Sequence, residues 1–117
     1  MVDTGVFSPQ TPKLLLITVA SETEARDLAL LLVNSGLAAC VNIIPGIQSI
    51  YQWQGALCED KELLLVVKTE AVQIQPIADL LSEHHSYTCP ELISLPIAEG
   101  SQAYLDWLLS HSQGPAH

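Results

Sequence analysis

The hydrophobic pattern at the start of the chain predicts a strand followed by a helix. Residues 14–19 form a short apolar run of strand length. Ser21 and Glu24 have the spacing of a capping box, which is typical of a helix N-terminus. Beyond them, apolar residues recur on one helical face, at Ala25, Leu28, Ala29 and Leu32. Gly36 marks the expected end of this helix, whose apolar face should pack on a sheet.

The next part of the chain has the two-residue period of a long β-hairpin. Residues 37–44 predict one strand, and apolar and polar side chains alternate again over residues 47–54. Pro45 and Gly46 interrupt the pattern and indicate a bulge or bend between the two parts. After a turn, residues 63–67 are continuously apolar and predict the returning strand.

A second helix, a fourth strand and a terminal helix complete the pattern. The second helix is predicted by apolar residues at helical spacing, Ile74, Ile77, Ala78 and Leu81. Residues 91–97 predict the strand. Pro90 and Pro96 at its limits favour a sheet edge, because proline cannot donate to the hydrogen-bond ladder. A short C-terminal helix is predicted after Gly100.

The βαββαβ order of these elements predicts an α+β fold, a ferredoxin-like sandwich. A long hairpin should protrude between its second and third strands, and a C-terminal helix should follow. The first and third strands of such a sheet are central, and both main helices lie on one face. We expect one domain over residues 13–111, with flexible tails over residues 1–12 and 112–117.

Two features indicate a homo-oligomer. The first and third strands are apolar on both faces, although two helices can cover only one face of a sheet. The first arm of the hairpin has about 18 residues at about 3.3 Å each, which outreaches helices of about 14 residues at about 1.5 Å each. The uncovered face and the surplus arm should therefore meet another copy of the chain.

The composition limits the partners and the compartment. The chain has 117 residues, a net charge of -9 and only four Lys and Arg residues. It lacks the basic surface that nucleic acids and anionic membranes attract. Its three cysteines have no CxxC spacing and cannot all pair, which favours a reducing, cytoplasmic location. No run approaches membrane-spanning length, and the apolar run near residue 14 lacks a signal-peptide cleavage region.

The densest group of reactive side chains lies between the second helix and the last strand, at His84, His85, Cys89 and Glu91. Imidazole, thiolate and carboxylate together suit Cu2+ or Zn2+, although their spacing matches no standard zinc motif. In the alternative interpretation, the histidines terminate the helix, Tyr87 packs and Glu91 makes a local hydrogen bond. Neither interpretation requires an obligatory cofactor.

Aromatic side chains mark a candidate inter-subunit cleft or interface. Tyr51 and Trp53 share one face of the protruding arm, where they form either a ligand platform or a contact with a neighbouring subunit. We assign Tyr87, after the second helix, and Trp107, in the terminal helix, to the same cleft or interface. The acidic stretch 59–62 is expected to be the solvated start of a strand.

The βαββαβ order serves several unrelated functions, and this sequence argues against most of them. RNA recognition needs basic and aromatic residues on the central strands, which here are Leu, Ile and Val. A heavy-metal chaperone needs paired cysteines in the first loop. Acylphosphatase chemistry needs a loop arginine, whereas Arg26, the sole arginine, lies in the first helix. We therefore expect no enzymatic activity.

Several linked motifs resemble the CutA divalent-cation tolerance family. They are LAACVNIIPG at residues 37–46, IYQWQG at 50–55, YTCPE at 87–91 with LPI at 95–97, and GSQAYLDW at 100–107. The resemblance extends over about residues 13–110. It implies a ferredoxin-like protomer in a tight homotrimer, with a non-enzymatic role in tolerance of copper and other divalent cations.

The resemblance also implies a copper-ligating set, which matches Ile17, His84 and Glu91 here. An isoleucine thus stands at the position of a cysteine ligand, and Cys89 is the candidate substitute. The family's His-Pro-Tyr-Glu pattern is altered to residues 85–88, His-Ser-Tyr-Thr. The leading hypothesis is divalent-cation binding or response. The alternatives are a signal-transduction-type regulator that binds a small anionic metabolite at subunit clefts and, less favoured, a hydrolase.

Overall fold

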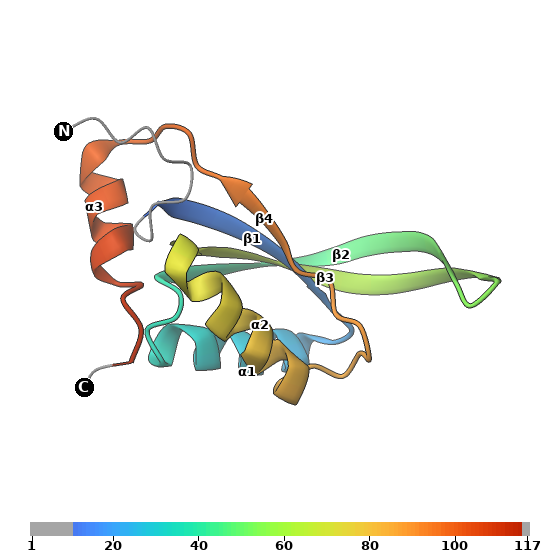
Figure 1. The fold of residues 1–117 in the computed structure, drawn as a ribbon. Coiled ribbons are helices and arrows are strands. Elements are labelled where there is room, and N and C mark those ends of the chain that lie inside the picture. The colour runs from blue at the N-terminus through green and yellow to red at the C-terminus, as the bar shows by residue number, and fades with distance from the viewer. Residues whose placement is uncertain (1–10, 116–117) are drawn as a thin grey trace.

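The chain runs β1-α1-β2-β3-α2-β4-α3, with a 3-10 turn, η1, before α2 (Figure 1). The computed structural model describes residues 11–115. The elements are β1 (Pro12–Val19), α1 (Glu22–Asn34), β2 (Cys40–Trp53), β3 (Ala56–Glu70), η1 (Ala71–Gln73), α2 (Ile74–His84), β4 (Ile93–Pro96) and α3 (Gln102–Ser110). The α+β, ferredoxin-like order predicted from the sequence is confirmed. Within the described residues, no helix has the length and apolar character needed to cross a membrane.

The four strands form one sheet in the order β2-β3-β1-β4, in which every neighbouring pair is antiparallel. The central position of β1 and β3 and the edge position of β4 are as predicted. β4 is shorter than the predicted strand over residues 91–97, because its ladder with β1 extends only from Ile93, opposite Leu16, to Pro96, opposite Lys13. Residues 91 and 92 lie outside the sheet.

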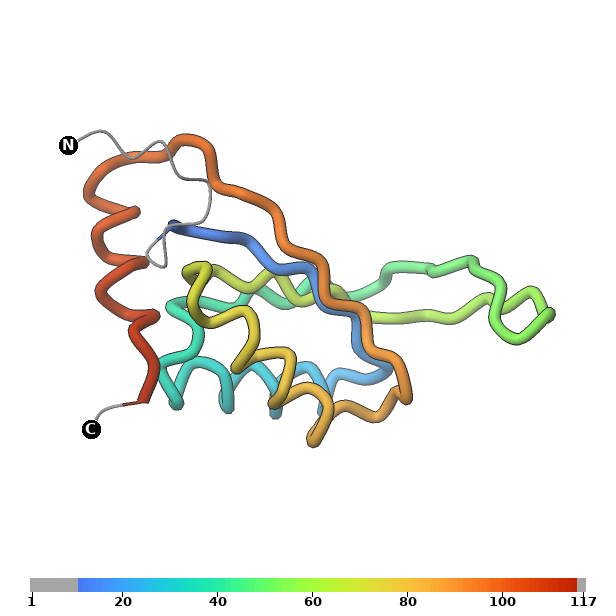
Figure 2. The backbone as a smooth tube through the Cα atoms, viewed as in Figure 1, coloured from blue at the N-terminus to red at the C-terminus, as the bar shows by residue number. Residues whose placement is uncertain are grey.

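The hairpin of β2 and β3 is the longest feature of the molecule (Figure 2). It pairs from Cys40 opposite Lys68 to Trp53 opposite Ala56, and its outer part extends beyond the helices. A two-residue turn at Gln54 and Gly55 reverses the chain, with φ of 51° and 80°. The principal dimensions of the molecule are 51 × 29 × 23 Å, and the arm provides much of the length.

Helices α1 and α2 cover one face of the sheet (Figure 1). The hydrophobic core lies between the two helices and the sheet. Alternate residues of the central strands and one face of each helix form it: Leu15, Ile17, Val19, Leu63, Leu65, Val67, Ala25, Leu28, Leu32, Ile77 and Leu81. The Ser21 hydroxyl accepts a hydrogen bond from the Glu24 N–H at 3.1 Å and caps α1 as predicted. The Glu24 carboxylate reaches back to the Ala20 N–H, one residue earlier than in a standard capping box.

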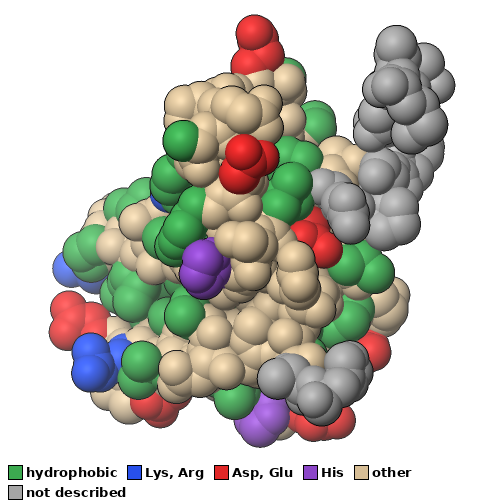
Figure 3. All heavy atoms as spheres, turned by 90° about the vertical axis from the view of Figure 1, so that its left-hand side faces the viewer, with side chains coloured by type: hydrophobic (Ala, Val, Ile, Leu, Met, Phe, Trp, Pro, Cys, Tyr) green, Lys and Arg blue, Asp and Glu red, His purple; other side chains and the backbone are tan. Residues whose placement is uncertain are grey.

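The opposite, outer face of the sheet is also apolar. Leu14 and Leu16 of β1 lie opposite Lys68 and Val66 of β3, and the open positions include Ile44, Ile93 and Leu95, each more than 40% exposed. Helix α3 contacts this sheet at the end away from the hairpin tip, where Leu108 is fully buried. Hydrophobic side chains also lie open on that end of the molecule (Figure 3).

Packing continues beyond residue 111, where the sequence predicted the start of a tail. Ser112 is buried, with its hydroxyl 3.0 Å from Glu70 Oε2, and its carbonyl accepts a hydrogen bond from Gln73 at 3.0 Å. The Gly114 N–H donates to the Gly36 carbonyl at 2.9 Å. At the other end, residues 1–10 of the predicted tail lie outside the described residues.

Candidate functional site

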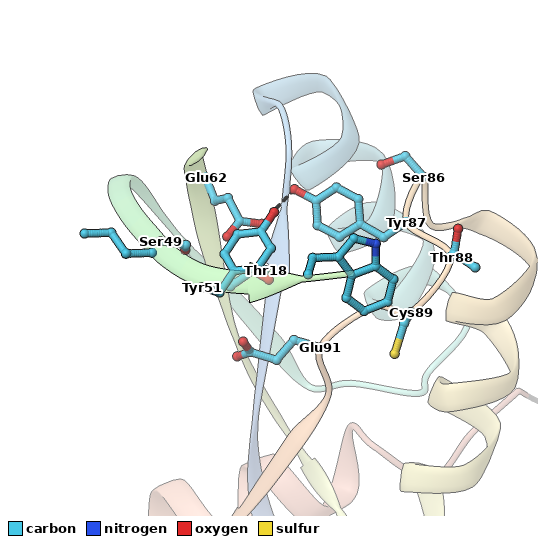
Figure 4. Close-up of a pocket in the computed structure, with 11 residues that line it drawn as sticks. Thr18, Ser49, Tyr51, Glu62, Ser86, Tyr87, Thr88, Cys89 and Glu91 are labelled. Atoms are coloured by element: carbon cyan, nitrogen blue, oxygen red, sulfur yellow. Dashed lines mark hydrogen bonds between the residues drawn. The ribbon is translucent and has the colours of Figure 1, made fainter. Parts of the chain in front are cut away.

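A cavity of about 660 Å³ lies where the hairpin leaves the body of the protein (Figure 4). Its walls come from three places: Thr18 at the end of β1, one face of the hairpin, and the segment 86–91 between α2 and β4. We call this cavity the hairpin cleft. It gathers side chains that lie up to 73 residues apart in the sequence, from Thr18 to Glu91.

A β-bulge decides which hairpin side chains face the cleft. Ile44 pairs with Leu64, but the next pair is Ile47 with Glu62, so β2 contains one extra residue between the two pairs. Because side chains alternate along a strand, the extra residue moves the odd-numbered positions of β2 to the outer face. Tyr51 and Trp53 therefore line the same cleft as Glu62.

Two tyrosines donate hydrogen bonds to carboxylates at the cleft. Tyr87 Oη donates to Glu62 Oε2 at 2.7 Å, and Tyr51 Oη donates to the Asp60 carboxylate. Burial is the main cause that raises the pKa of Tyr87, and the hydrogen bond to Glu62 is the second. The hydrogen bond to Asp60 raises the pKa of Tyr51 to about 12. Both hydroxyls therefore stay protonated at neutral pH. Figure 4 shows the hydroxyl ends of Tyr51 and Tyr87 converging near Glu62.

The cleft is acidic. Glu62 is only 6% exposed, and Glu91 lines the same cavity. Burial raises the pKa of Glu91, and the nearby negative charge of Glu62 adds to the rise. Among the described residues that line the cleft, none is Lys, Arg or His. A cation in the cleft would thus relieve the repulsion between two carboxylates, of which Glu62 is offset only by the hydrogen bond from Tyr87.

His85 fixes the wall of the cleft rather than offering a ligand. Its side chain is fully buried, and its Nδ1 accepts a hydrogen bond from the Tyr87 N–H at 3.0 Å. Nε2, 2.8 Å from the Thr18 carbonyl, must therefore carry the ring proton and donate to it. Because both ring nitrogens are engaged, His85 cannot bind a metal without breaking one of these bonds.

Glu24 holds the same segment from the side of α1. Its carboxylate accepts hydrogen bonds from the Ser86 N–H at 2.7 Å and the Ser86 hydroxyl at 3.0 Å, in addition to the Ala20 N–H. Burial raises the pKa of Glu24, but the hydrogen bonds from Ser86 and Ala20 outweigh burial, so the pKa is lowered overall. His85 and Glu24 together set the position of Tyr87.

The structure does not assemble the four predicted metal ligands into one cluster. Cys89 and Glu91 line the hairpin cleft, but His84 is exposed at the end of α2 and lines a separate groove beside α1. Ile17 faces the core and is fully buried. Within residues 11–115, no group of three or more His, Cys, Asp and Glu side chains could hold a metal ion. The cluster expected from the sequence therefore does not form within one protomer.

The remaining predicted residues separate into two places. Tyr51, Trp53 and Tyr87 line the cleft, whereas Trp107 lies on α3, stacked on His111 with ring centroids 4.9 Å apart. Glu62 was not among the predicted site residues, because the charged stretch 59–62 resembles a solvated strand start. The available signal was the alternation in β3, which puts Glu62 on the same face as Leu64 and Val66.

Comparisons with known proteins place this arrangement in one family. The model of the family described as CutA1 divalent ion tolerance protein matches residues 13–111. The chain is 53% identical over 96 residues to the divalent-cation tolerance protein CutA of Thermus thermophilus, covering 82% of this chain and 93% of that protein. It is 44% identical to the chloroplastic protein CutA of Arabidopsis thaliana over 79% of this chain, but spans only 50% of that longer relative.

Comparison with solved structures agrees with these sequence matches. The divalent cation tolerance protein (Cut A1) from Thermus thermophilus superposes with a TM-score of 0.84 at 50% identity, and the match covers 86% of this chain and 98% of that one. The family model matches most of the chain, the Thermus thermophilus relative has a similar length, and its solved structure has the same fold. The chain belongs to the CutA1 divalent ion tolerance protein family.

Proposed function

We propose that this protein acts in divalent-cation tolerance by binding divalent cations, copper among them, at the hairpin cleft. The observation that carries the proposal is the pair of carboxylates, Glu62 and Glu91, in a cavity without a described basic side chain. Burial and the negative charge of Glu62 raise the pKa of Glu91, so a cation beside the two carboxylates is favoured electrostatically.

The donor set favours exchangeable rather than tightly held ions. Two carboxylates and the thiol of Cys89 line the cleft, while both histidines are directed elsewhere. Cu2+ and Zn2+ accept carboxylate and thiolate ligands, and water completes their coordination where the protein supplies few donors. Because protons compete for the raised-pKa carboxyl of Glu91, we expect cation binding to weaken as the pH falls.

The proposed role involves no catalysis and disfavours an anionic ligand. His85 uses both ring nitrogens in hydrogen bonds, and His84 lies in another groove, so neither can serve as a base for Cys89. A small anionic metabolite would meet two carboxylates and no described cation in the cleft. The regulator hypothesis from the sequence therefore ranks below cation binding.

The proposal includes a homotrimer as the working form. Its support is the open apolar face of the sheet, with Ile44, Ile93 and Leu95, and the arm that extends past its own helices. The number three rests on the family. Sedimentation or light scattering should give a mass three times that of the 12.7 kDa chain, and a monomer at micromolar concentration would contradict it.

The proposal also retains the cytoplasm as the compartment. Cys40, Cys58 and Cys89 are all free, and Cys89 is exposed, as expected of a protein kept in a reducing environment. Cell fractionation with detection of the native chain would test this location. Recovery in an oxidising compartment would overturn it.

Calorimetric titration with Cu2+ and with Zn2+ tests the cation site. We expect binding to wild type to be weakened roughly tenfold or more in Glu62→Gln and Glu91→Gln, because each substitution removes one of two charges. His84→Ala is the matched control, since His84 lies outside the cleft, and should bind like wild type. Loss of binding in His84→Ala but not in the glutamate variants would reject the proposed site.

A further inference from the structure

We infer that the hairpin cleft also binds a compact organic ammonium ion, held between aromatic rings and carboxylates. This inference rests on the cation preference proposed above but names a chemically different class of ligand. It comes from the part of the lining that a metal ion does not use, the rings of Tyr51, Trp53 and Tyr87.

The aromatic rings are held in place, but packing within the protomer leaves their faces open. Tyr51 is 41% exposed and Trp53 is 48% exposed, so neither belongs to the core of the protomer. The hydrogen bonds of Tyr51 to Asp60 and of Tyr87 to Glu62 hold the two phenol rings in place and occupy their hydroxyls. What remains for a ligand is the ring surface, whose negative electrostatic face attracts ammonium groups.

The carboxylates supply the complementary charge. Glu62 is held by Tyr87 at one side of the cleft, and Glu91 lies on the segment that forms another wall (Figure 4). A ring and a carboxylate both favour a cation, whereas a neutral apolar ligand would leave two carboxylates desolvated without compensation. The lining therefore favours a ligand that carries both a positive charge and apolar carbon groups.

The cleft offers an organic cation surface that a metal ion leaves unused. Within residues 11–115 no three His, Cys, Asp or Glu side chains are grouped around one point, so a metal ion there would depend on the carboxylates and water and would leave the rings free. An ammonium ion with carbon substituents loses less hydration on entry and contacts the rings directly. The cavity of about 660 Å³ lies in the size range of small-molecule sites.

Choline and its neutral isostere 3,3-dimethylbutan-1-ol form a matched pair of probes, because they share a shape and differ in charge. Ethanolamine serves as a second cation without the methyl groups. In Trp107→Phe, Trp53 is the sole tryptophan, so its fluorescence reports directly on the cleft. We expect choline to bind at least tenfold more tightly than the neutral alcohol, by fluorescence and by calorimetry.

Two variants locate the binding. Trp53→Leu keeps an apolar side chain but removes the ring, and Glu91→Gln keeps the shape but removes the charge. Each should weaken choline binding roughly fivefold to tenfold by calorimetry, while His84→Ala leaves it unchanged. The inference is overturned if neither cation binds more tightly than the neutral alcohol, or if both variants bind choline like wild type.

The two proposals for the cleft can fail separately. If Cu2+ or Zn2+ binds with the expected dependence on Glu62 and Glu91 but choline and ethanolamine do not bind, the organic-cation inference falls and the proposed function stands. If choline binds as expected and neither metal does, the proposed metal site falls and the organic-cation site stands. Competition between choline and Cu2+ in one titration would show that both occupy the same cleft.

Discussion

Replacing His85 with alanine should destabilise the protein strongly, although the neighbouring histidine can be removed without loss. The His85 side chain is fully buried and joins two elements, with Nε2 2.8 Å from the Thr18 carbonyl and Nδ1 3.0 Å from the Tyr87 amide nitrogen. Its ring also packs beside the Tyr87 ring, with centroids 4.7 Å apart. In His85→Ala, one donor and one acceptor lose their partner and the ring leaves a cavity.

The expected loss follows from these contacts. Each buried group left without a partner costs about 1–3 kcal/mol, and the values at the low end apply because water can reach the half-buried Tyr87 backbone. With the lost packing, the free energy of unfolding should fall by about 2–4 kcal/mol. His85→Asn retains an acceptor near the Tyr87 amide but not the donor to Thr18, so its loss should be intermediate.

Urea unfolding followed by circular dichroism measures the difference directly. His84→Ala is the control, since the His84 side chain is 52% exposed, and its stability should lie within about 0.5 kcal/mol of wild type. All variants must be compared at one protomer concentration, because assembly would add to stability. A His85→Ala variant within about 0.5 kcal/mol of wild type would refute the structural role assigned to this histidine.

Three further predictions concern other parts of the molecule. Gly36→Ala should lower the free energy of unfolding by about 2–4 kcal/mol in urea unfolding, because a Cβ there would collide with the Gly114 carbonyl oxygen at a φ of +75°. Gly46→Ala is its control, with a similar φ of +78° but no atom within 4 Å, and should cost only about 1 kcal/mol. Burial raises the pKa of Glu70, despite the hydrogen bond from Ser112, so this carboxyl favours folding at pH below its unfolded pKa and loses that contribution as pH rises through the folded value. In Glu70→Gln, the melting temperature relative to wild type should therefore rise as the pH increases through the raised pKa of Glu70, and a constant difference between the two proteins would contradict the assignment. In a spectrophotometric titration of the tyrosines, Tyr51→Phe should remove a component with a pKa of about 12, and persistence of that component would show that it belongs to another tyrosine.

The fold was predictable because its elements follow simple periods. The apolar residues expected to face a sheet in α1, Ala25, Leu28 and Leu32, are buried, and the helical pattern before residue 84 forms α2. Pro45 and Gly46 interrupt the alternation where the bulge occurs. These are local signals, in which a few neighbouring residues determine backbone geometry.

The four predicted metal ligands do not lie together in one protomer, because closeness along the chain does not fix side-chain direction. His84, His85, Cys89 and Glu91 lie within eight positions, but the chain leaves α2 and turns toward the sheet edge between them. His85 then turns inward to Thr18, while His84 remains at the helix end in a different groove. Turn residues such as Ser86 and Pro90 indicate that the chain bends here, but not which way the neighbouring side chains point.

Glu62 shows most clearly why the cleft could not be predicted in full. In the sequence it follows three other charged residues and resembles a solvated strand start, yet it is almost completely buried under a tyrosine 25 positions later. The bulge moves Tyr51 and Trp53 to the face of the sheet that carries Glu62, and Tyr87 lines the same cleft. The protein thus buries a carboxylate and leaves aromatic rings exposed at one place, the reverse of what folding alone favours. Packing within the protomer does not account for that reversal, so the cleft is the place at which to test contacts with a cation and with a neighbouring subunit, by the cation titrations and by the mass of the assembly.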